Sequence, residues 1–132
     1  MKIISWNARG LDSQIKQRIL KKKVQKKKPD IIFVQETKCT SSTIFNISKK
    51  LGKHMEYMET ANNGWEGGLI TLWNPQVIKI LSSEATRSFI AIEAQVVGNS
   101  ETYMCTNVYR PQKLEEKFLF IRTLWNLKLR YP

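Results

Sequence analysis

The sequence predicts an α+β fold in which one mixed β-sheet is covered by helices on at least one face. Two observations predict it: two short β-branched runs flank a basic helical segment within the first 34 residues, and four closely spaced apolar runs follow between residues 69 and 109. A strand–helix–strand unit favours parallel strands with a right-handed crossover, whereas short connections favour antiparallel strands. The 132 residues have room for one domain of this kind.

The first predicted unit is a strand, a helix and a second strand. Residues 3–6 and 31–34 are apolar and rich in β-branched side chains, which is typical of strands. Asp12 and Ser13 are candidate N-caps for the intervening helix, and Pro29 ends it. The apolar residues that recur every four positions at its start are Leu11, Ile15 and Ile19.

The rest of the chain predicts a short helix, five strands and a final helix. Residues 43–51 form the short helix, which Gly52 ends, and residues 62–68, with two Asn and three Gly, are typical of a loop. The five predicted strands are 55–59, 69–73, 77–81, 89–97 and 102–109. Turn signals between the last four strands occur at Asn74-Pro75, Ser82-Ser83 and Gly98-Asn99-Ser100. The apolar face of the amphipathic final helix is formed by Leu114, Phe118, Ile121 and Trp125.

Composition excludes several classes of protein. No apolar run reaches the roughly 18–20 residues that span a bilayer, and the run at residues 3–6 is too short for a signal peptide. Cys39 and Cys105 are too few and too far apart for a disulfide framework or a zinc site. We therefore expect a nuclear or cytoplasmic protein without membrane contact, in which the single histidine, His54, has no special role.

Polar side chains follow three of the predicted strands at the point where each strand ends. Asn7 closes the first strand, Glu36 the second and Tyr109 the last. The first two strands are expected to be parallel, so their carboxyl ends meet at one edge of the sheet, the usual place for a site. Glu36 offers a hard oxygen ligand suited to Mg²⁺, and Asn7 offers a donor and an acceptor. The alternative, an ordinary surface glutamate after a strand, stays open.

The formal net charge of +11 comes mainly from one segment. Residues 16–28 carry eight of the 22 Lys and Arg and none of the 11 Asp and Glu. Two interpretations stay open: the solvated face of a helix, or a segment for phosphate binding or nuclear import. Its far end is expected about 20–25 Å from the site edge at a rise of ~1.5 Å per residue. We therefore do not expect this run to line the site, although it can contribute salt-dependent attraction to a polyanion.

Four segments together resemble a known family. Residues 4–11 read ISWNARGL, residues 29–38 read PDIIFVQETK, residues 67–70 read GGLI and residues 107–111 read NVYRP. In this order and spacing they resemble the signatures of the endonuclease/exonuclease/phosphatase family. The resemblance is strongest to the apurinic/apyrimidinic endonuclease-like domain of plant LINE-type non-LTR retrotransposons. It runs along essentially the whole chain but covers only the first half of the family's domain.

The resemblance implies a fold. Residues 1–132 would be a truncated, N-terminal half of the domain, forming one layer of the family's four-layer α/β/β/α sandwich: a mixed sheet with helices on its outer face. One layer alone would expose its inner face, with residues from 69–73 and 89–97 in water. We therefore expect self-association, aggregation or marginal stability, or pairing with the missing second half of the domain.

The resemblance also implies roles for individual residues in hydrolysis of DNA phosphodiester bonds. Glu36 would bind the catalytic Mg²⁺, with Mn²⁺ as an alternative, Asn7 would orient the scissile phosphate, and Tyr109 would hydrogen-bond a phosphate oxygen. The implied contacts to nucleic acid are Lys38, Trp65 and Gln112. For Trp65 the alternative interpretation is that it anchors its loop. Gln112 stands where the family usually has Asn.

Other features depart from the family's pattern. Arg9 stands where repair enzymes of the family have an acid, and Arg110 is bulkier than the usual residue. The water-activating Asp motif and the C-terminal Ser-Asp-His have no counterpart in the sequence. We therefore expect little or no nuclease activity from this chain alone. Two alternatives stay open: a non-catalytic retroelement relic that binds nucleic acid through charge, and a family member that acts on RNA or phosphoinositides.

Overall fold

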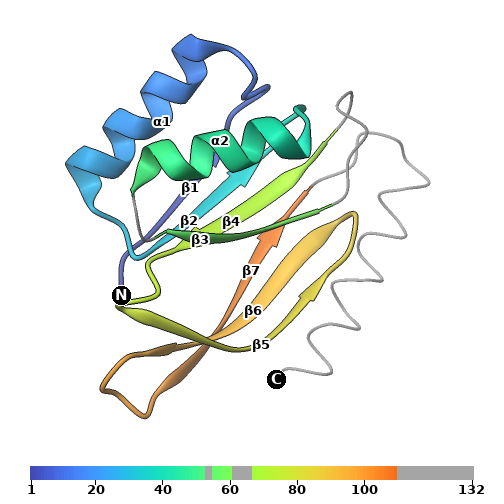
Figure 1. The fold of residues 1–132 in the computed structure, drawn as a ribbon. Coiled ribbons are helices and arrows are strands. Elements are labelled where there is room, and N and C mark those ends of the chain that lie inside the picture. Colours follow the sequence, from blue (N-terminus) through green and yellow to red (C-terminus); the bar gives the residue numbers. More distant parts are fainter. Residues whose placement is uncertain (53–54, 61–66, 110–132) are drawn as a thin grey trace.

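The computed structural model describes residues 1–52, 55–60 and 67–109. Within them it contains two helices and seven strands (Figure 1). In chain order these are β1 (Ile3–Asn7), α1 (Gln14–Lys27), β2 (Ile31–Gln35), α2 (Ser41–Leu51), β3 (Glu56–Glu59), β4 (Leu69–Trp73), β5 (Ile78–Ala85), β6 (Phe89–Val96) and β7 (Thr102–Val108). The predicted final helix, His54 and most of the predicted loop at 62–68 lie outside the described residues.

The first four strands form a mixed sheet with the order β1-β2-β4-β3. β1 and β2 are parallel, as the strand–helix–strand pattern predicts, and β4 pairs antiparallel with both β2 and β3. Both helices lie on one face of this sheet (Figure 1). The α+β class and the mixed sheet with helices on its outer face are therefore confirmed.

The structure adds a second sheet on the inner face of the first. β5, β6 and β7 form a separate antiparallel sheet instead of extending the first one. The chain leaves the first sheet at Asn74, whose backbone oxygen accepts hydrogen bonds from the amides of Val77 at 3.0 Å and Ile78 at 2.9 Å. The chain thus contributes to both sheets of a partial sandwich, rather than to one layer only.

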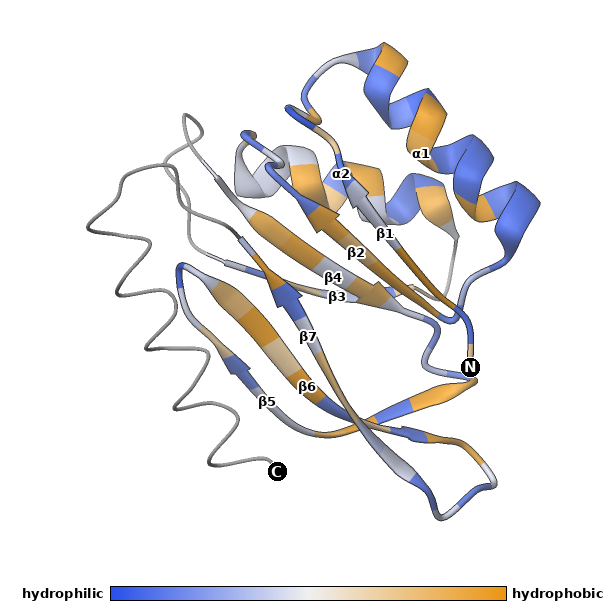
Figure 2. Cartoon of the chain, turned by 180° about the vertical axis from the view of Figure 1, so that it is seen from behind, coloured by the Kyte–Doolittle hydropathy of each residue, from blue (hydrophilic) through white to orange (hydrophobic). Residues whose placement is uncertain are grey.

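A shared apolar core joins the two sheets. The first sheet contributes Ile31, Phe33, Leu69 and Trp73 to it, and the second contributes Ile78, Ile90, Ile92, Ala94 and Cys105. Figure 2 shows the apolar residues concentrated on β2, β4 and β6. The expectation that residues from 69–73 and 89–97 would be exposed on an uncovered face is therefore wrong, because the second sheet covers that face. The inner face of the first sheet therefore gives no reason to expect self-association.

The outer core lies between the helices and the first sheet. Leu20 of α1 and Ile44 and Ile47 of α2 pack there on the outward side chains of β2 and β4. Ser13 caps α1 as predicted, and its hydroxyl accepts a hydrogen bond from the amide of Lys16 at 3.2 Å. The apolar residues that recur at the start of the helix do not share one side of the core, because Leu11 is fully buried whereas Ile15 is 69% exposed.

The structure differs from the sequence prediction at Ser82-Ser83. These residues do not form a turn: β5 continues through them, with a register shift between Ile80 and Ser82. The hydroxyl of Ser82 donates to Glu93 Oε2 on the paired strand at 2.8 Å, which keeps the two polar residues within the ladder. Within residues 1–52, 55–60 and 67–109, no helix is long and apolar enough to cross a membrane.

Candidate functional site

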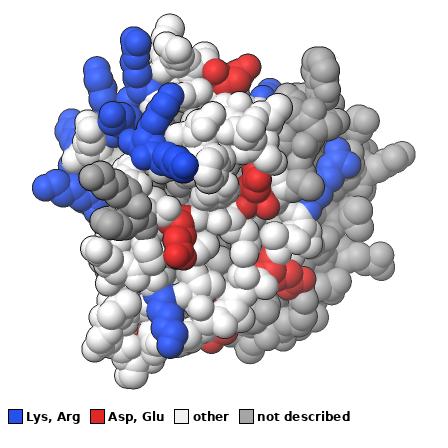
Figure 3. All heavy atoms as spheres, in the orientation of Figure 1, with Lys and Arg blue, Asp and Glu red and all other residues white. Residues whose placement is uncertain are grey.

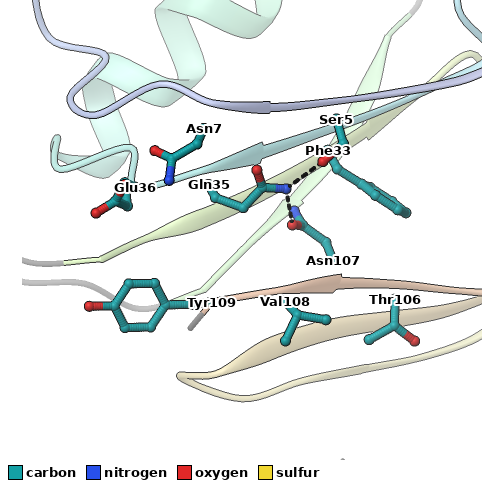
Figure 4. Close-up of a pocket in the computed structure, with 9 residues that line it drawn as sticks. All are labelled: Ser5, Asn7, Phe33, Gln35, Glu36, Thr106, Asn107, Val108 and Tyr109. Carbon is teal, nitrogen blue, oxygen red and sulfur yellow. Dashed lines mark hydrogen bonds between the residues drawn. The ribbon is translucent and has the colours of Figure 1, made fainter. Parts of the chain in front are cut away.

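A cleft of about 470 Å³ lies between the two sheets at the carboxyl ends of β1, β2 and β7 (Figure 4). Its described lining consists of Ser5, Asn7, Phe33, Gln35, Glu36, Thr106, Asn107, Val108 and Tyr109. The structure therefore brings together the three residues that the sequence singled out at strand ends: Asn7, Glu36 and Tyr109. Their individual roles stay predictions.

Asn7 reaches the cleft because of the alternation along β1. Ser5 and Asn7 line the cleft, whereas Ile4 and Trp6 pack on the outer core beneath the helices. The side-chain oxygen of Asn7 accepts a hydrogen bond from the amide of Arg9 at 3.1 Å. This bond fixes the side chain of Asn7, and its amide nitrogen has no hydrogen-bond partner among the described residues.

Two backbone turns hold Glu36 at the mouth of the cleft. Three of the residues here adopt positive φ although they are not glycine: Arg9 at 51°, Glu36 at 53° and Lys38 at 47°. The carbonyl oxygen of Glu36 accepts a hydrogen bond from the amide of Gly10 at 2.8 Å, which ties the two turns together. A left-handed backbone costs roughly 1–2 kcal/mol per non-glycine residue, and such strain clusters at functional sites.

Tyr109 is positioned by its backbone and by a glycine. Its amide donates to the carbonyl oxygen of Ser88 at 2.8 Å. A Cβ atom added to Gly67 would lie 3.6 Å from Cζ of the Tyr109 ring, so the ring packs on the glycine backbone. The backbone of Gly67 also accepts a hydrogen bond from the amide of Lys38 at 3.1 Å. One loop therefore supports both Tyr109 and the turn that follows Glu36.

The two sheets are joined inside the cleft by a network of amide side chains that was not predicted from the sequence. The Gln35 amide nitrogen donates to Asn107 Oδ1 at 2.8 Å and to the Ser5 hydroxyl at 3.0 Å (Figure 4). Asn107 is 1% exposed, and its own nitrogen donates to the backbone oxygen of Ile70 at 3.0 Å. The sequence contained one signal for Asn107. It lies two positions from the apolar Cys105, so the two side chains lie on the same face of the strand, and both are buried.

The three predicted nucleic-acid contacts do not all fall on the cleft. Lys38, two positions after Glu36, is half-buried and is not among the described residues that line the cleft. Arg9 is exposed and does not line the cleft either. Trp65 and Gln112 lie outside the described residues. Neither thiol is among the described residues that line the cleft: Cys39 belongs to the outer core and Cys105 to the core between the sheets. Burial raises the pKa of Cys39 to about 11, so its thiol stays protonated at neutral pH.

The donor set of the cleft fits one type of metal site. Glu36 supplies a carboxylate, which is a hard ligand, whereas the side-chain oxygen of Asn7 already accepts a hydrogen bond from the Arg9 amide. No group of three or more His, Cys, Asp or Glu side chains among the described residues could hold a metal ion. Mg²⁺ commonly binds through one or two carboxylates and keeps water and phosphate as its other ligands. The residues therefore fit a Mg²⁺ held largely by water and substrate phosphate, not an all-protein cage.

Comparison with known proteins places these features in context. The sequence profile of the Endonuclease/Exonuclease/phosphatase family matches residues 4–122. Over 79 residues, which make up 59% of this chain, the sequence is 34% identical to a DNA-(apurinic or apyrimidinic site) endonuclease of Dictyostelium discoideum. The chain spans only 22% of the length of that relative.

Two solved structures illustrate the similarity of fold. A mannosyl-6-phosphatase of Bacteroides thetaiotaomicron superposes with a TM-score of 0.74 at 12% identity, over 98% of this chain and 59% of the other. An AP endonuclease of Archaeoglobus fulgidus superposes with a TM-score of 0.69 at 16% identity, over 100% of this chain and 52% of the other. At such identities the likeness shows the fold alone, and the chain spans little more than half of each structure.

Proposed function

The chain belongs to the endonuclease/exonuclease/phosphatase family, and on that premise we propose that its cleft is the metal- and phosphate-binding part of a Mg²⁺-dependent phosphodiesterase that cleaves DNA. One observation carries the proposal: Asn7, Glu36 and Tyr109 lie at the carboxyl ends of three different strands and line the same cleft. The similarity to a DNA-(apurinic or apyrimidinic site) endonuclease supports DNA as the substrate.

Each of the three residues has a distinct part in the proposed chemistry. Glu36 would hold Mg²⁺, with Mn²⁺ as the alternative, and the bound metal would supply polarisation of a phosphoryl oxygen. Asn7, held by its bond to the Arg9 amide, directs its side-chain nitrogen at a phosphate oxygen. The hydroxyl of Tyr109 donates to a non-bridging oxygen as negative charge develops there.

The described part of the cleft offers no general base for hydrolysis. Glu36 is the sole Asp, Glu or His among the described lining residues, and metal binding occupies it. Activation of water needs a further group within hydrogen-bond reach of the nucleophile. We therefore propose that this chain alone hydrolyses DNA poorly or not at all, and that the second half of the domain supplies the missing group.

Two finer proposals concern origin and location. The segment ISWNARGL at residues 4–11 supports a LINE-type retrotransposon origin over the other branches of the family, with this chain as the N-terminal half of the endonuclease domain. A nuclear or cytoplasmic location is supported by the cysteines, since Cys39 and Cys105 are both free and buried.

The metal-binding role of Glu36 can be tested by binding to a duplex that carries an abasic-site analogue. Without metal, Glu36→Gln should bind this duplex at least as tightly as the wild type, because a carboxylate repels phosphate. Added Mg²⁺ should strengthen wild-type binding by about tenfold, or about 1.4 kcal/mol, and should not strengthen the binding of Glu36→Gln. Fluorescence anisotropy of the labelled duplex measures both effects.

A matched control and an activity assay complete this test. Glu56 is exposed on the edge strand β3, outside the described lining of the cleft, so Glu56→Gln should respond to Mg²⁺ like the wild type. An equal response to Mg²⁺ in Glu36→Gln would rule out the metal assignment. Robust Mg²⁺-dependent nicking of abasic plasmid by the purified chain, lost in Glu36→Ala, would instead refute the proposed inactivity.

A further inference from the structure

We propose that the outer surface of α1 is a second nucleic-acid-binding surface, which contacts backbone phosphates independently of the cleft. We call this the α1 surface. It consists of eight exposed cations on α1, at its C-cap and on the neighbouring helix α2: Arg18, Lys21, Lys22, Lys23, Lys26, Lys27, Lys28 and Lys50. Figure 3 shows this gathering of basic side chains over α1.

The charge of the α1 surface is not neutralised within the described part of the protein. Residues 16–28 contain no acidic side chain. Across residues 1–52, 55–60 and 67–109, none of the eight cations forms an ion pair. Lys50 joins the surface through its ammonium group, which donates to Gln17 Oε1 of α1 at 3.4 Å. A polyanion that binds here therefore need not displace an acidic partner of these cations.

The geometry of α1 presents a row of these charges outward. Leu20 is the fully buried residue of α1, and Arg18, Lys22 and Lys26 recur every four residues on the opposite side. The 14 residues of α1 extend over about 21 Å at ~1.5 Å per residue. Duplex DNA carries one charge per ~1.7 Å of its axis, counting both strands, so a duplex of this length holds roughly a dozen phosphates, and those on its near side can face the helix.

The α1 surface and the cleft are separated by the first sheet, because α1 packs on its outer core and the cleft is lined from its other face. The ammonium group of Lys16 donates to the backbone oxygen of Ala8 at 2.8 Å. The ammonium groups of Lys16 and Lys23 also lie 5.9 and 5.7 Å from the centre of the Trp6 ring. Trp6 points to the helices whereas the next residue, Asn7, lines the cleft. The α1 surface and the cleft therefore lie on opposite faces of the first sheet.

The distribution of apolar residues favours nucleic acid over a membrane surface. Ile15 and Ile19, 69% and 38% exposed, are the exposed apolar side chains of α1, and both lie in its first half. The outward side of the second half carries only cations and Gln25. A helix that lies in a membrane interface needs an apolar face along its length. Phosphate groups along a nucleic-acid backbone need only the charges.

The test removes three charges from the outward row and three from elsewhere. Arg18→Gln/Lys22→Gln/Lys26→Gln changes the α1 surface, and Lys2→Gln/Lys79→Gln/Arg87→Gln removes three other exposed cations. Both variants lose three positive charges, so the two have equal net charge, and Gln has nearly the same helix propensity as Lys and Arg. Binding of a labelled duplex is measured by fluorescence anisotropy over a range of salt concentrations, after circular dichroism has shown that each variant is folded.

The expected result is a selective change in salt dependence. The slope of log K against log salt concentration should fall by about 2–3 in the α1 variant, since each lost phosphate contact contributes roughly 0.9. The control should change by less than about 1. Equal changes in the two variants, or tighter binding to vesicles rich in phosphatidylserine than to DNA, would overturn the proposal. Glu36→Gln should leave the α1-dependent change in slope intact, which separates this proposal from that for the cleft.

Discussion

Individual polar side chains at the strand ends define the cleft, and the sequence located only some of them. Asn7, Glu36 and Tyr109 could be predicted because each follows an apolar run, so its position needs only the strand boundary. Alternation along the strand places Asn107 on the same side as Cys105, but its hydrogen-bond partners could not be predicted, because Gln35 and Ile70 are 72 and 37 positions away. Its role depends on which sheet faces which, and local pattern does not contain that information.

The buried position of Asn107 leads to a prediction about stability. Asn107→Ala removes the acceptor of the Gln35 amide and the donor to the Ile70 carbonyl, both in the core-facing part of the cleft. We expect the free energy of unfolding to fall by about 1–3 kcal/mol, as measured by urea denaturation. Ser5→Ala removes an exposed partner of the same network and should change it by less than about 0.5 kcal/mol. Equal effects would show that the network is not anchored at Asn107.

At the scale of elements, the boundaries of α1 were predictable and its buried side was not. The cap at Ser13 and the stop at Pro29 are local signals, and both are confirmed. Which side chains of α1 face the sheet depends on how the helix docks, and here Leu20 is buried in preference to Ile15. The extended β5 has the same explanation, because pairing with β6 overrides the turn preference of Ser82-Ser83.

At the C-terminus of α1, substitution of a single residue should raise the free energy of unfolding. Lys28 caps the helix with φ 47° and ψ 58°, and its amide donates to the carbonyl oxygen of Val24. Lys28→Gly should raise the free energy of unfolding by about 0.5–1 kcal/mol, because glycine adopts this left-handed backbone without strain. Lys27→Gly loses the same charge within the helix and should lower it by a similar amount. Thermal denaturation compares the pair, and destabilisation by both would contradict this account of the cap.

At the scale of the whole molecule, the division of strands between two sheets could not be predicted from the sequence. Four closely spaced apolar runs predict antiparallel strands equally well whether they extend a sheet or start a new one. The structure resolves this through side chains distant in sequence, since Ile31 and Phe33 of β2 share a core with Ile90 and Ile92 of β6. The shared core also makes the stability of each sheet depend on the other.

This shared core predicts that the two sheets unfold together. Ile92 is fully buried in it, so Ile92→Ala should lower the free energy of unfolding by about 2–5 kcal/mol. Native-state hydrogen exchange should show the same loss of protection in β4, on the opposite sheet, as in β6 itself. Leu81 of β5 is 42% exposed, so Leu81→Ala should change protection in neither strand by more than about 0.5 kcal/mol. If Ile92→Ala lowered protection in β6 and left β4 at the wild-type level, the sheets would be separate folding units, and the positions of Glu36 and Tyr109 on opposite sides of the cleft would not be coupled.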